Sequence, residues 1–230
     1  MPSDAATLAA RRKPRAGESP EYSAARTALL ADEIELQRRI DALAAKRAAL
    51  PPGPVIEQDY RFHDMNGETV SLAGLFAAHD TLVTYFWMYG PEREQPCPMC
   101  TNLLGPLDAN APDIEQRGAL VVIGRSPVER QIAFARERGW QHLKFVQCDG
   151  DAYPLDFGGW IPDKQWEYPI MAVFQKDGDQ VRLFWKGEMT GEMADDGKDP
   201  RGGVDLAPMW NVLDMTPEGR GTDWYPKLSY

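Results

Sequence analysis

The chain has 230 residues, of which 43% are hydrophobic and 26% charged. This is the balance of a globular protein with room for one domain and extensions. Acidic residues outnumber basic ones by 35 to 25, and the net charge is −10. Such a surface repels nucleic acid and anionic membrane faces, because both bind concentrated positive charge. No apolar run approaches the roughly 18 residues of a membrane-spanning helix.

Residues 1–20 predict a disordered tail. Its basic residues are followed by Pro14, Gly17 and Pro20 rather than by the apolar stretch of an export signal. The chain contains three cysteines, and two of them are separated by only two residues. A secreted scaffold stapled by disulfides would carry more. We therefore expect a cytoplasmic protein.

The segment 21–52 predicts an N-terminal helix, with helical composition from Ser23 to Leu50. Four leucines recur at every seventh position and Ile40 shares their face: Leu29, Leu36, Leu43 and Leu50. Glu33 and Arg47 occupy positions where a coiled coil favours apolar side chains. The pattern fits a helix docked on its own domain and equally a homodimer contact. Two prolines, 51 and 52, end the helix.

Residues 53–221 predict one α/β domain, followed by a tail over 222–230. Asn66-Gly67 indicates a hairpin within Tyr60–Leu75. Runs of β-branched and aromatic residues predict five strands: Thr81–Met88, Ala119–Gly124, Lys144–Gln147, Ile170–Phe174 and Val181–Trp185. The expected helices are Cys97–Gln116, with kinks or a break at its two prolines, Val128–Arg138 and Leu206–Leu213, and a loop covers Glu188–Pro208. This order predicts a central mixed sheet with helices on its faces.

Cys97-Pro98-Met99-Cys100 directly follows the first buried strand and opens a helix. A thiol at a helix N-terminus is favoured as the thiolate, because unpaired N–H groups and the helix dipole stabilise an anion. The second thiol, about one turn further on, can attack a mixed disulfide and release the product. We predict that Cys97 is the nucleophile and Cys100 the resolving thiol. Pro98 suits the first turn of a helix.

Other uses of these cysteines stay open. A cysteine pair can bind metal, and His142 with Cys148 could complete a Cys₃His zinc set, but the spacing matches no compact knuckle and we expect no metal site. Cys148 is either a second resolving thiol or a small buried hydrophobe.

Several stretches resemble known families. YFWM with CPMC, and YPIMAVFQKDG, resemble the thioredoxin superfamily, and FHDMNGETVSLAGLF is similar to the entry hairpin of peroxiredoxins. Three blocks resemble more closely a bacterial family of thioredoxin-like proteins of unknown function, domain-of-unknown-function family 899, described as predicted dithiol–disulfide oxidoreductases: YFWMYGPEREQPCPMC, GRSPVERQIAFARERGW and NVLDMTPEGRG. The similarity runs from Ala24 to Gly221. It implies a thioredoxin-like fold with an N-terminal helical extension, and a redox activity whose substrate is undefined.

The superfamily resemblance further implies that Pro169 adopts the cis form and faces the cysteine pair, the alternative being a proline that simply starts a strand. We expect six residues to line a substrate groove: Trp87, Tyr89, Pro98, Met99, Tyr168 and Pro169. The sequence also departs from its relatives. Tyr85 stands where thioredoxins carry a buried acid, so a proton shuttle for the resolving thiol is not evident. Gly90 and Glu94 replace the proline and threonine of peroxiredoxins, which argues against a dedicated peroxidase.

Two functions follow from these residues. The first is a dithiol–disulfide oxidoreductase that acts, without a cofactor, on a disulfide in a protein or small thiol compound and draws electrons from an unidentified donor. The second is a thioredoxin-fold binding or scaffold protein that keeps the cysteines but does not turn over.

Overall fold

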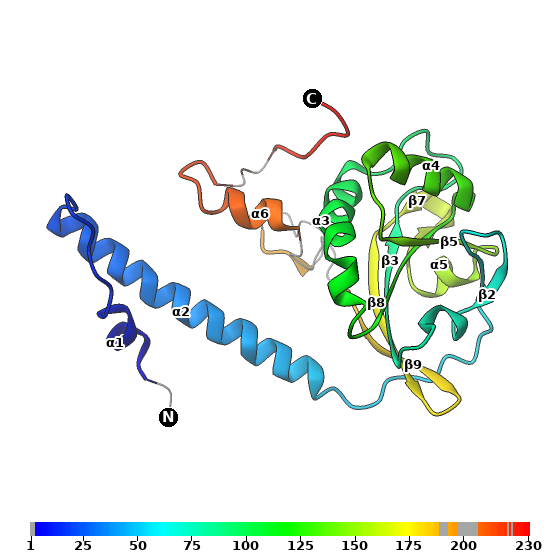
Figure 1. The fold of residues 1–230 in the computed structure, drawn as a ribbon, viewed down its shortest axis with the longest axis horizontal. Helices are drawn as coiled ribbons and strands as arrows, with labels where there is room; N and C mark the ends of the chain where they lie inside the picture. Colours follow the sequence, from blue (N-terminus) through cyan, green and yellow to red (C-terminus); the bar gives the residue numbers. More distant parts are fainter. Residues whose placement is uncertain (1–2, 189–192, 197–206, 220, 222) are drawn as a thin grey trace. The chain divides into compact units, whose positions relative to one another are not determined.

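A computed structural model describes residues 3–188, 193–196, 207–219, 221 and 223–230. The chain forms two compact units, Met1–Pro51 and Pro52–Tyr230 (Figure 1). Most of the loop predicted over Glu188–Pro208 lies outside the described residues. Among the helices that the structure describes, none is both long and apolar enough to cross a bilayer.

The first unit consists of helix α1, Ala5–Ala9, packed against the long helix α2, Pro20–Ala48. Ser19 caps α2, since its hydroxyl accepts a hydrogen bond from the Tyr22 amide at 3.1 Å. Asp4 caps α1 in the same way through Thr7. The segment predicted to be a disordered tail therefore contains a short capped helix, and the prediction does not hold for residues 5–9.

The second unit is built on a seven-stranded sheet with the order β2-β1-β5-β4-β3-β8-β9. Its strands have these bounds: β1 Arg61–His63, β2 Thr69–Ser71, β3 Thr81–Trp87, β4 Ala119–Gly124, β5 Lys144–Cys148, β8 Ile170–Asp177 and β9 Gln180–Lys186. A separate small hairpin pairs β6, Trp160–Ile161, with β7, Trp166–Glu167. The helices are α3 Pro98–Ile114, α4 Val128–Arg138, α5 Ala152–Asp156 and α6 Pro208–Leu213, with 3₁₀ turns at Gly74–Phe76 and Pro162–Lys164.

The strand pairing defines the fold class. β3 and β4 are parallel and joined through α3, β8 pairs antiparallel with β3, and β9 pairs antiparallel with β8. A β-α-β unit followed by a hairpin, in the spatial order β4-β3-β8-β9, is the thioredoxin-like arrangement. The parallel strand β5 and the β1–β2 hairpin extend this sheet at one edge. The predicted α/β fold with a central mixed sheet is confirmed.

The two faces of the sheet pack separate cores, because successive strand residues point to opposite faces. Leu82 and Phe86 of β3 join the core that includes Phe174 and Tyr153. Tyr85 and Trp87 of the same strand join the other core: Cys100, Leu104, Val122, Phe134, Phe145 and their neighbours. Helix α3 runs without a break through Pro106 and Pro112, so these prolines do not divide the helix. The cysteine pair therefore belongs to the α3 face of the sheet.

Candidate active site

Cys97 is the N-cap residue of α3, and Pro98 occupies the first turn. The preceding loop, residues 88–96, returns from the end of β3, and the Cys97 amide donates to the Met88 carbonyl at 3.0 Å. This bond fixes the cap next to the end of the central strand. All three cysteines are free thiols. Cys97 is partly exposed, whereas Cys100 is buried beneath it, 1% exposed.

Cys97 carries a stabilised thiolate. A hydrogen bond from the Cys100 thiol is the largest influence on it and lowers its pKa; burial opposes this, and the backbone N–H groups of Cys100 and Met99 and the charge of Arg93 lower it further. Together they lower the pKa of Cys97 to about 6. At neutral pH the sulfur at the helix N-terminus is therefore largely ionised, as a nucleophile requires.

Cys100 lies in a relay of three side chains. Its thiol donates to Cys97, and the hydroxyl of Tyr85 donates to Cys100. Burial is the main reason that the pKa of Cys100 is raised well above its usual range, and Tyr85 partly offsets that rise. Burial likewise raises the pKa of Tyr85, which is 5% exposed, so its hydroxyl stays protonated and remains a donor. Tyr85, which stands where thioredoxins carry a buried acid, thus interacts with Cys100.

A buried carboxylate holds the start of the cysteine loop. Glu167 of β7 is 2% exposed and accepts hydrogen bonds from the Gly90 amide and from Nε of Arg93, each at 3.0 Å. Arg125 lies 3.5 Å from its other oxygen. A Cβ at position 90 would overlap Glu167 Oε1, so a larger residue there would displace the carboxylate. Burial raises the pKa of Glu167, against the effects of the Gly90 amide and the two arginines. The carboxylate thereby orients Arg93, whose charge favours the Cys97 thiolate.

Arg130 of α4 holds the middle of the same loop. Its guanidinium donates to the carbonyl oxygens of Arg93 and, at 2.9 Å, Glu94. It also lies over the ring of Tyr89, 4.4 Å from the centroid. The loop before Cys97 is therefore tied to α4 as well as to β7, which fixes the geometry of the thiol that follows it.

The predicted groove residues separate into two groups. Pro98, Met99 and Pro169 are partly exposed and Tyr168 is exposed, so all four are accessible. Trp87 and Tyr89 are 0% and 4% exposed. They pack in the same core as Cys100, against aromatic rings: Phe134 contacts both, and Trp140 and Phe145 contact Trp87. The expectation that these two residues form a groove platform is wrong, because their side chains stabilise the core instead.

The peptide bond before Pro169 also differs from expectation. No cis peptide bond occurs in the described ranges, so Tyr168–Pro169 is trans. The Tyr168 amide donates to the Gly159 carbonyl at 2.9 Å, and the chain continues in extended form from β7 into β8. Ile170, the next residue, pairs with Phe86 near the end of β3. Pro169 therefore directly precedes β8, at the end of the sheet where β3 leads into the cysteine loop.

Comparison with known proteins decides the family. The profile of the bacterial proteins of unknown function called DUF899 matches residues 11–230. The chain belongs to the DUF899 family. This DUF899 protein matches none of the curated proteins.

Solved structures similar to the DUF899 protein include two peroxiredoxins and a thioredoxin. A cysteine-to-serine mutant of PrxQ from Xylella fastidiosa is 14% identical over 60% of this chain and 84% of its own, with a TM-score of 0.45. Peroxidoxin BcpB of Mycobacterium tuberculosis is 18% identical over 58% and 84%, with a TM-score of 0.46. The exposed lipoprotein thioredoxin Etrx1 of Streptococcus pneumoniae is 15% identical over 59% and 94%, with a TM-score of 0.40.

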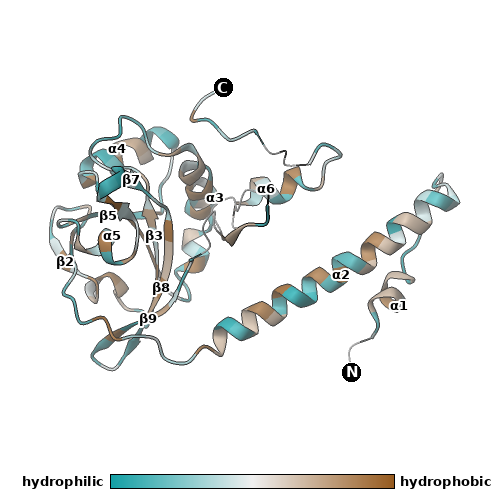
Figure 2. Cartoon of the chain, turned by 180° about the vertical axis from the view of Figure 1, so that it is seen from behind, coloured by the Kyte–Doolittle hydropathy of each residue, from teal (hydrophilic) through white to brown (hydrophobic). Residues whose placement is uncertain are grey.

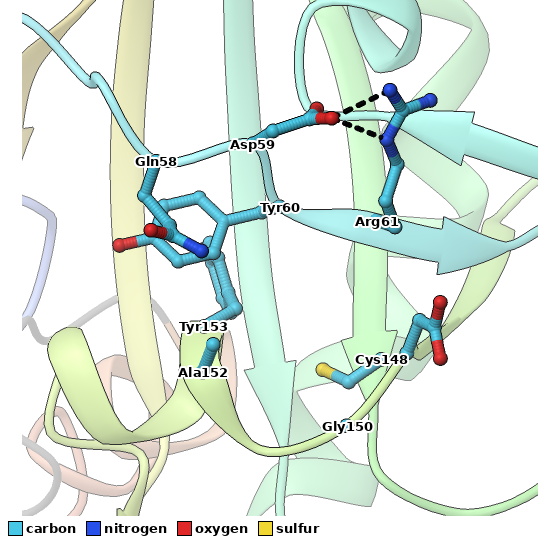
Figure 3. Close-up of a pocket in the computed structure, with 9 residues that line it drawn as sticks. Gln58, Asp59, Tyr60, Arg61, Cys148, Gly150, Ala152 and Tyr153 are labelled. Atoms are coloured by element: carbon cyan, nitrogen blue, oxygen red, sulfur yellow. Dashed lines mark hydrogen bonds and ion pairs between the residues drawn. The ribbon is translucent and has the colours of Figure 1, made fainter.

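The third cysteine of the DUF899 protein is separate from the pair. Cys148 ends β5 and packs in the core on the opposite face from Cys97 and Cys100. It borders an open cavity of about 200 Å³ with Tyr60 and Tyr153 (Figure 3). Burial raises the pKa of the Cys148 thiol far above its usual range. Within the described ranges no three His, Cys, Asp or Glu side chains cluster as metal ligands would. Neither a second resolving thiol nor a Cys₃His zinc set is formed.

Sequence reasoning missed two site residues. Glu167 lies 77 positions from Gly90, and a single glutamate outside any motif gives no signal in the sequence. Arg130 was predicted only as part of a helix. The one available signal for Tyr85 was its place in the strand before the cysteines. That place showed that the buried acid of thioredoxins is absent, but not which group the Tyr85 hydroxyl contacts.

Proposed function

We propose that this protein is a dithiol–disulfide oxidoreductase with Cys97 as nucleophile and Cys100 as resolving thiol. The observation that carries the proposal is the accessible thiolate at the N-cap of α3 with a buried thiol hydrogen-bonded to it. A structural thiol pair would need neither the lowered pKa nor the difference in exposure between its members.

The reaction proceeds in two exchanges. The Cys97 thiolate attacks one sulfur of a substrate disulfide, and the other substrate sulfur leaves as a thiolate and takes a proton from water. Cys100 then loses its proton to solvent, its sulfur attacks Sγ of Cys97, and the second substrate sulfur leaves. The substrate gains two electrons and the pair becomes a disulfide. An external dithiol of a reducing compartment such as the cytoplasm restores the pair by the reverse exchange.

Tyr85 assists the second exchange. As Cys100 gives up its proton, the Tyr85 hydroxyl donates to the sulfur anion, which would otherwise form in a buried, apolar setting. Tyr85 is therefore a positioning residue for the resolving thiol, in the role of an anion stabiliser and not of a base. No organic cofactor is needed for any of these steps.

The substrate is a disulfide in a protein or small thiol compound. Four accessible side chains would offer apolar surface for the molecule that carries this disulfide: Pro98, Met99, Tyr168 and Pro169.

The test is to trap the mixed disulfide. With Cys100→Ser, Cys97 should form a stable adduct with a small disulfide such as 5,5′-dithiobis(2-nitrobenzoate), detected by intact mass. Cys97→Ser should form none at that rate, and Cys148→Ser, the matched control, should turn over as the wild type does. A wild-type pair that cannot cycle would refute the proposal and support a binding protein without turnover. Undiminished turnover by Cys97→Ser would refute the proposal as well, because the activity would then not depend on Cys97.

A further inference from the structure

Arg93 presents a guanidinium at the cysteine loop with most of its N–H donors unused. Its Nε donates to the buried carboxylate of Glu167 at 3.0 Å, and its guanidinium carbon lies 5.3 Å from the centroid of the Trp166 ring. Among the residues that the structure describes, no side chain or carbonyl accepts a hydrogen bond from Nη1 or Nη2 of Arg93. The side chain is 27% exposed, which leaves these donors available to a group that enters from solvent.

Arg93 and Cys97 are held at the same end of the sheet. The Cys97 amide donates to the Met88 carbonyl, and the Gly90 amide donates to the Glu167 oxygen that also accepts from Arg93. The strands that meet there, β3 and β8, are largely apolar and mostly brown in Figure 2. The charge of Arg93 acts on the Cys97 sulfur, but these two described side chains do not hydrogen-bond to each other. An anionic group can therefore bind Arg93 while Cys97 stays free to attack.

The carboxylates near this guanidinium do not cancel it. Arg125 lies 3.5 Å from Glu167 and from Glu92, so a second cation shares the buried carboxylate that holds Arg93. Glu92 and Glu94 are both exposed, and water screens exposed charges strongly. Arg93 differs from them because a buried carboxylate fixes its Nε, and its remaining donors are thereby held in one direction.

We propose that Arg93 selects disulfides that carry a carboxylate close to their sulfur atoms. The inference rests on the proposed function, since it names the substrate class of the same site. A guanidinium holds a carboxylate through two parallel N–H···O bonds. The Cys97 thiolate then attacks one sulfur of the bound disulfide, the other sulfur leaves as a thiolate, and the carboxylate itself takes no part in the exchange. That carboxylate belongs to a small thiol compound or to an acidic residue beside a protein disulfide.

The test compares disulfides that differ in charge. Cys100→Ser retains the adduct on Cys97, so intact mass follows the first exchange with 3,3′-dithiodipropionate and with its neutral diamide in low salt. Each rate constant is divided by that of 2-mercaptoethanol with the same compound, which removes the intrinsic reactivity of the two disulfides. After this correction Cys100→Ser should prefer the carboxylate compound by roughly three- to tenfold. Adding Arg93→Gln should abolish the preference, and adding Arg93→Lys should keep part of it.

The ratio of the two rates separates recognition from reactivity. Arg93→Gln also changes the pKa of Cys97, but that change acts on both disulfides alike and cancels in the ratio. Arg61→Gln is the matched control, because it removes the same charge from β1, which β5 and β4 separate from β3, and it should leave the preference unchanged. Disulfide-bonded peptides with aspartate or asparagine beside each cysteine extend the comparison to protein substrates. An Arg93-dependent preference in either set supports the proposal and shows which source of carboxylate the site accepts.

Three results would overturn the inference while leaving the proposed function intact. The first is equal corrected rates for the charged and neutral members of both sets. The second is a preference that survives in Arg93→Gln or that Arg61→Gln abolishes as well. The third is a preference for the cationic disulfide cystamine, which would mean that Glu92 and Glu94 dominate the site. A chain that forms no adduct on Cys97 with any of these disulfides would refute the proposed function and this inference with it.

Discussion

Replacing Tyr85 by phenylalanine isolates the contribution of one hydroxyl to the resolving step. The ring that packs in the α3-side core is retained, and only the donor to Cys100 is removed. A hydrogen bond to a charged group is worth about 1.5–3 kcal/mol, and one pKa unit corresponds to about 1.4 kcal/mol. Tyr85→Phe should therefore raise the pKa of Cys100 further, because its thiolate loses that hydrogen bond.

The resolution rate should fall by a smaller factor than the fraction of Cys100 present as thiolate. The fraction of Cys100 present as thiolate falls by about ten- to a hundredfold, but a more basic thiolate is a better nucleophile, with a Brønsted slope of about 0.4–0.5. The two effects combine to slow the attack of Cys100 on Cys97 by about three- to fifteenfold. The first exchange, made by the exposed Cys97, should change much less.

Stopped-flow measurements with a chromogenic disulfide separate the two exchanges, since the first thiolate is released before Cys100 attacks. Tyr85→Phe should accumulate the mixed disulfide that the wild type resolves. Because the pKa of Cys100 lies well above this pH range in both chains, both resolution rates should rise with pH and their ratio should stay nearly constant. Tyr153→Phe is the matched control, because its hydroxyl is also buried but bonds to Thr84 at 3.1 Å on the opposite face. Equal resolution rates in the wild type and Tyr85→Phe across pH 6–9 would refute this role.

Three further outcomes follow from the site. The alkylation rate of Cys97 should rise with pH through a midpoint near 6. Arg93→Gln should move that midpoint upward by removing a positive charge, and an unchanged midpoint would argue against an effect of the Arg93 charge on the Cys97 thiolate. Glu167→Gln should lower the free energy of unfolding in urea by about 3 kcal/mol, because it leaves Arg93 and Arg125 without their buried partner. Asp108 accepts hydrogen bonds from three backbone amides, at positions 141, 142 and 143, and against the opposing effect of burial these bonds lower its pKa. Its stabilisation is thus present at neutral pH and is lost as the pH falls through the folded-state pKa, so Asp108→Asn should destabilise the protein at pH 7 and much less at pH 3.

The sequence predicted best those elements whose signals are local. The strand Ala119–Gly124 and the helix Val128–Arg138 have the predicted bounds. Every residue of that strand is buried, which its continuous apolar run indicated, and the helix ends at Gly139 with φ of 75°, a conformation that favours glycine. By contrast, α5 and the β6–β7 hairpin were not predicted. Each has two to five residues, too few to show a helix or strand period.

The site shows why long-range contacts escape this kind of reasoning. Gly90 and Glu167 meet only because β7 leads into β8, the antiparallel neighbour of β3. Nothing in the residues around either position indicates that pairing.

Tyr85 shows a second limit, which concerns chemistry more than distance. Thioredoxins carry a buried acid where this chain has Tyr85, and the sequence alone therefore indicates that a proton acceptor for the resolving thiol is missing. A phenol whose pKa is raised cannot accept the proton of Cys100 at neutral pH, yet it can stabilise the sulfur anion once the proton has left. A carboxylate would thus assist this step by accepting the proton of Cys100, whereas a phenol assists it by donating a hydrogen bond to the sulfur anion. Only the carboxylate is a group that titrates below neutral pH. Resolution in this protein should therefore accelerate steadily with pH, without the acidic limb that a buried carboxylate base would produce.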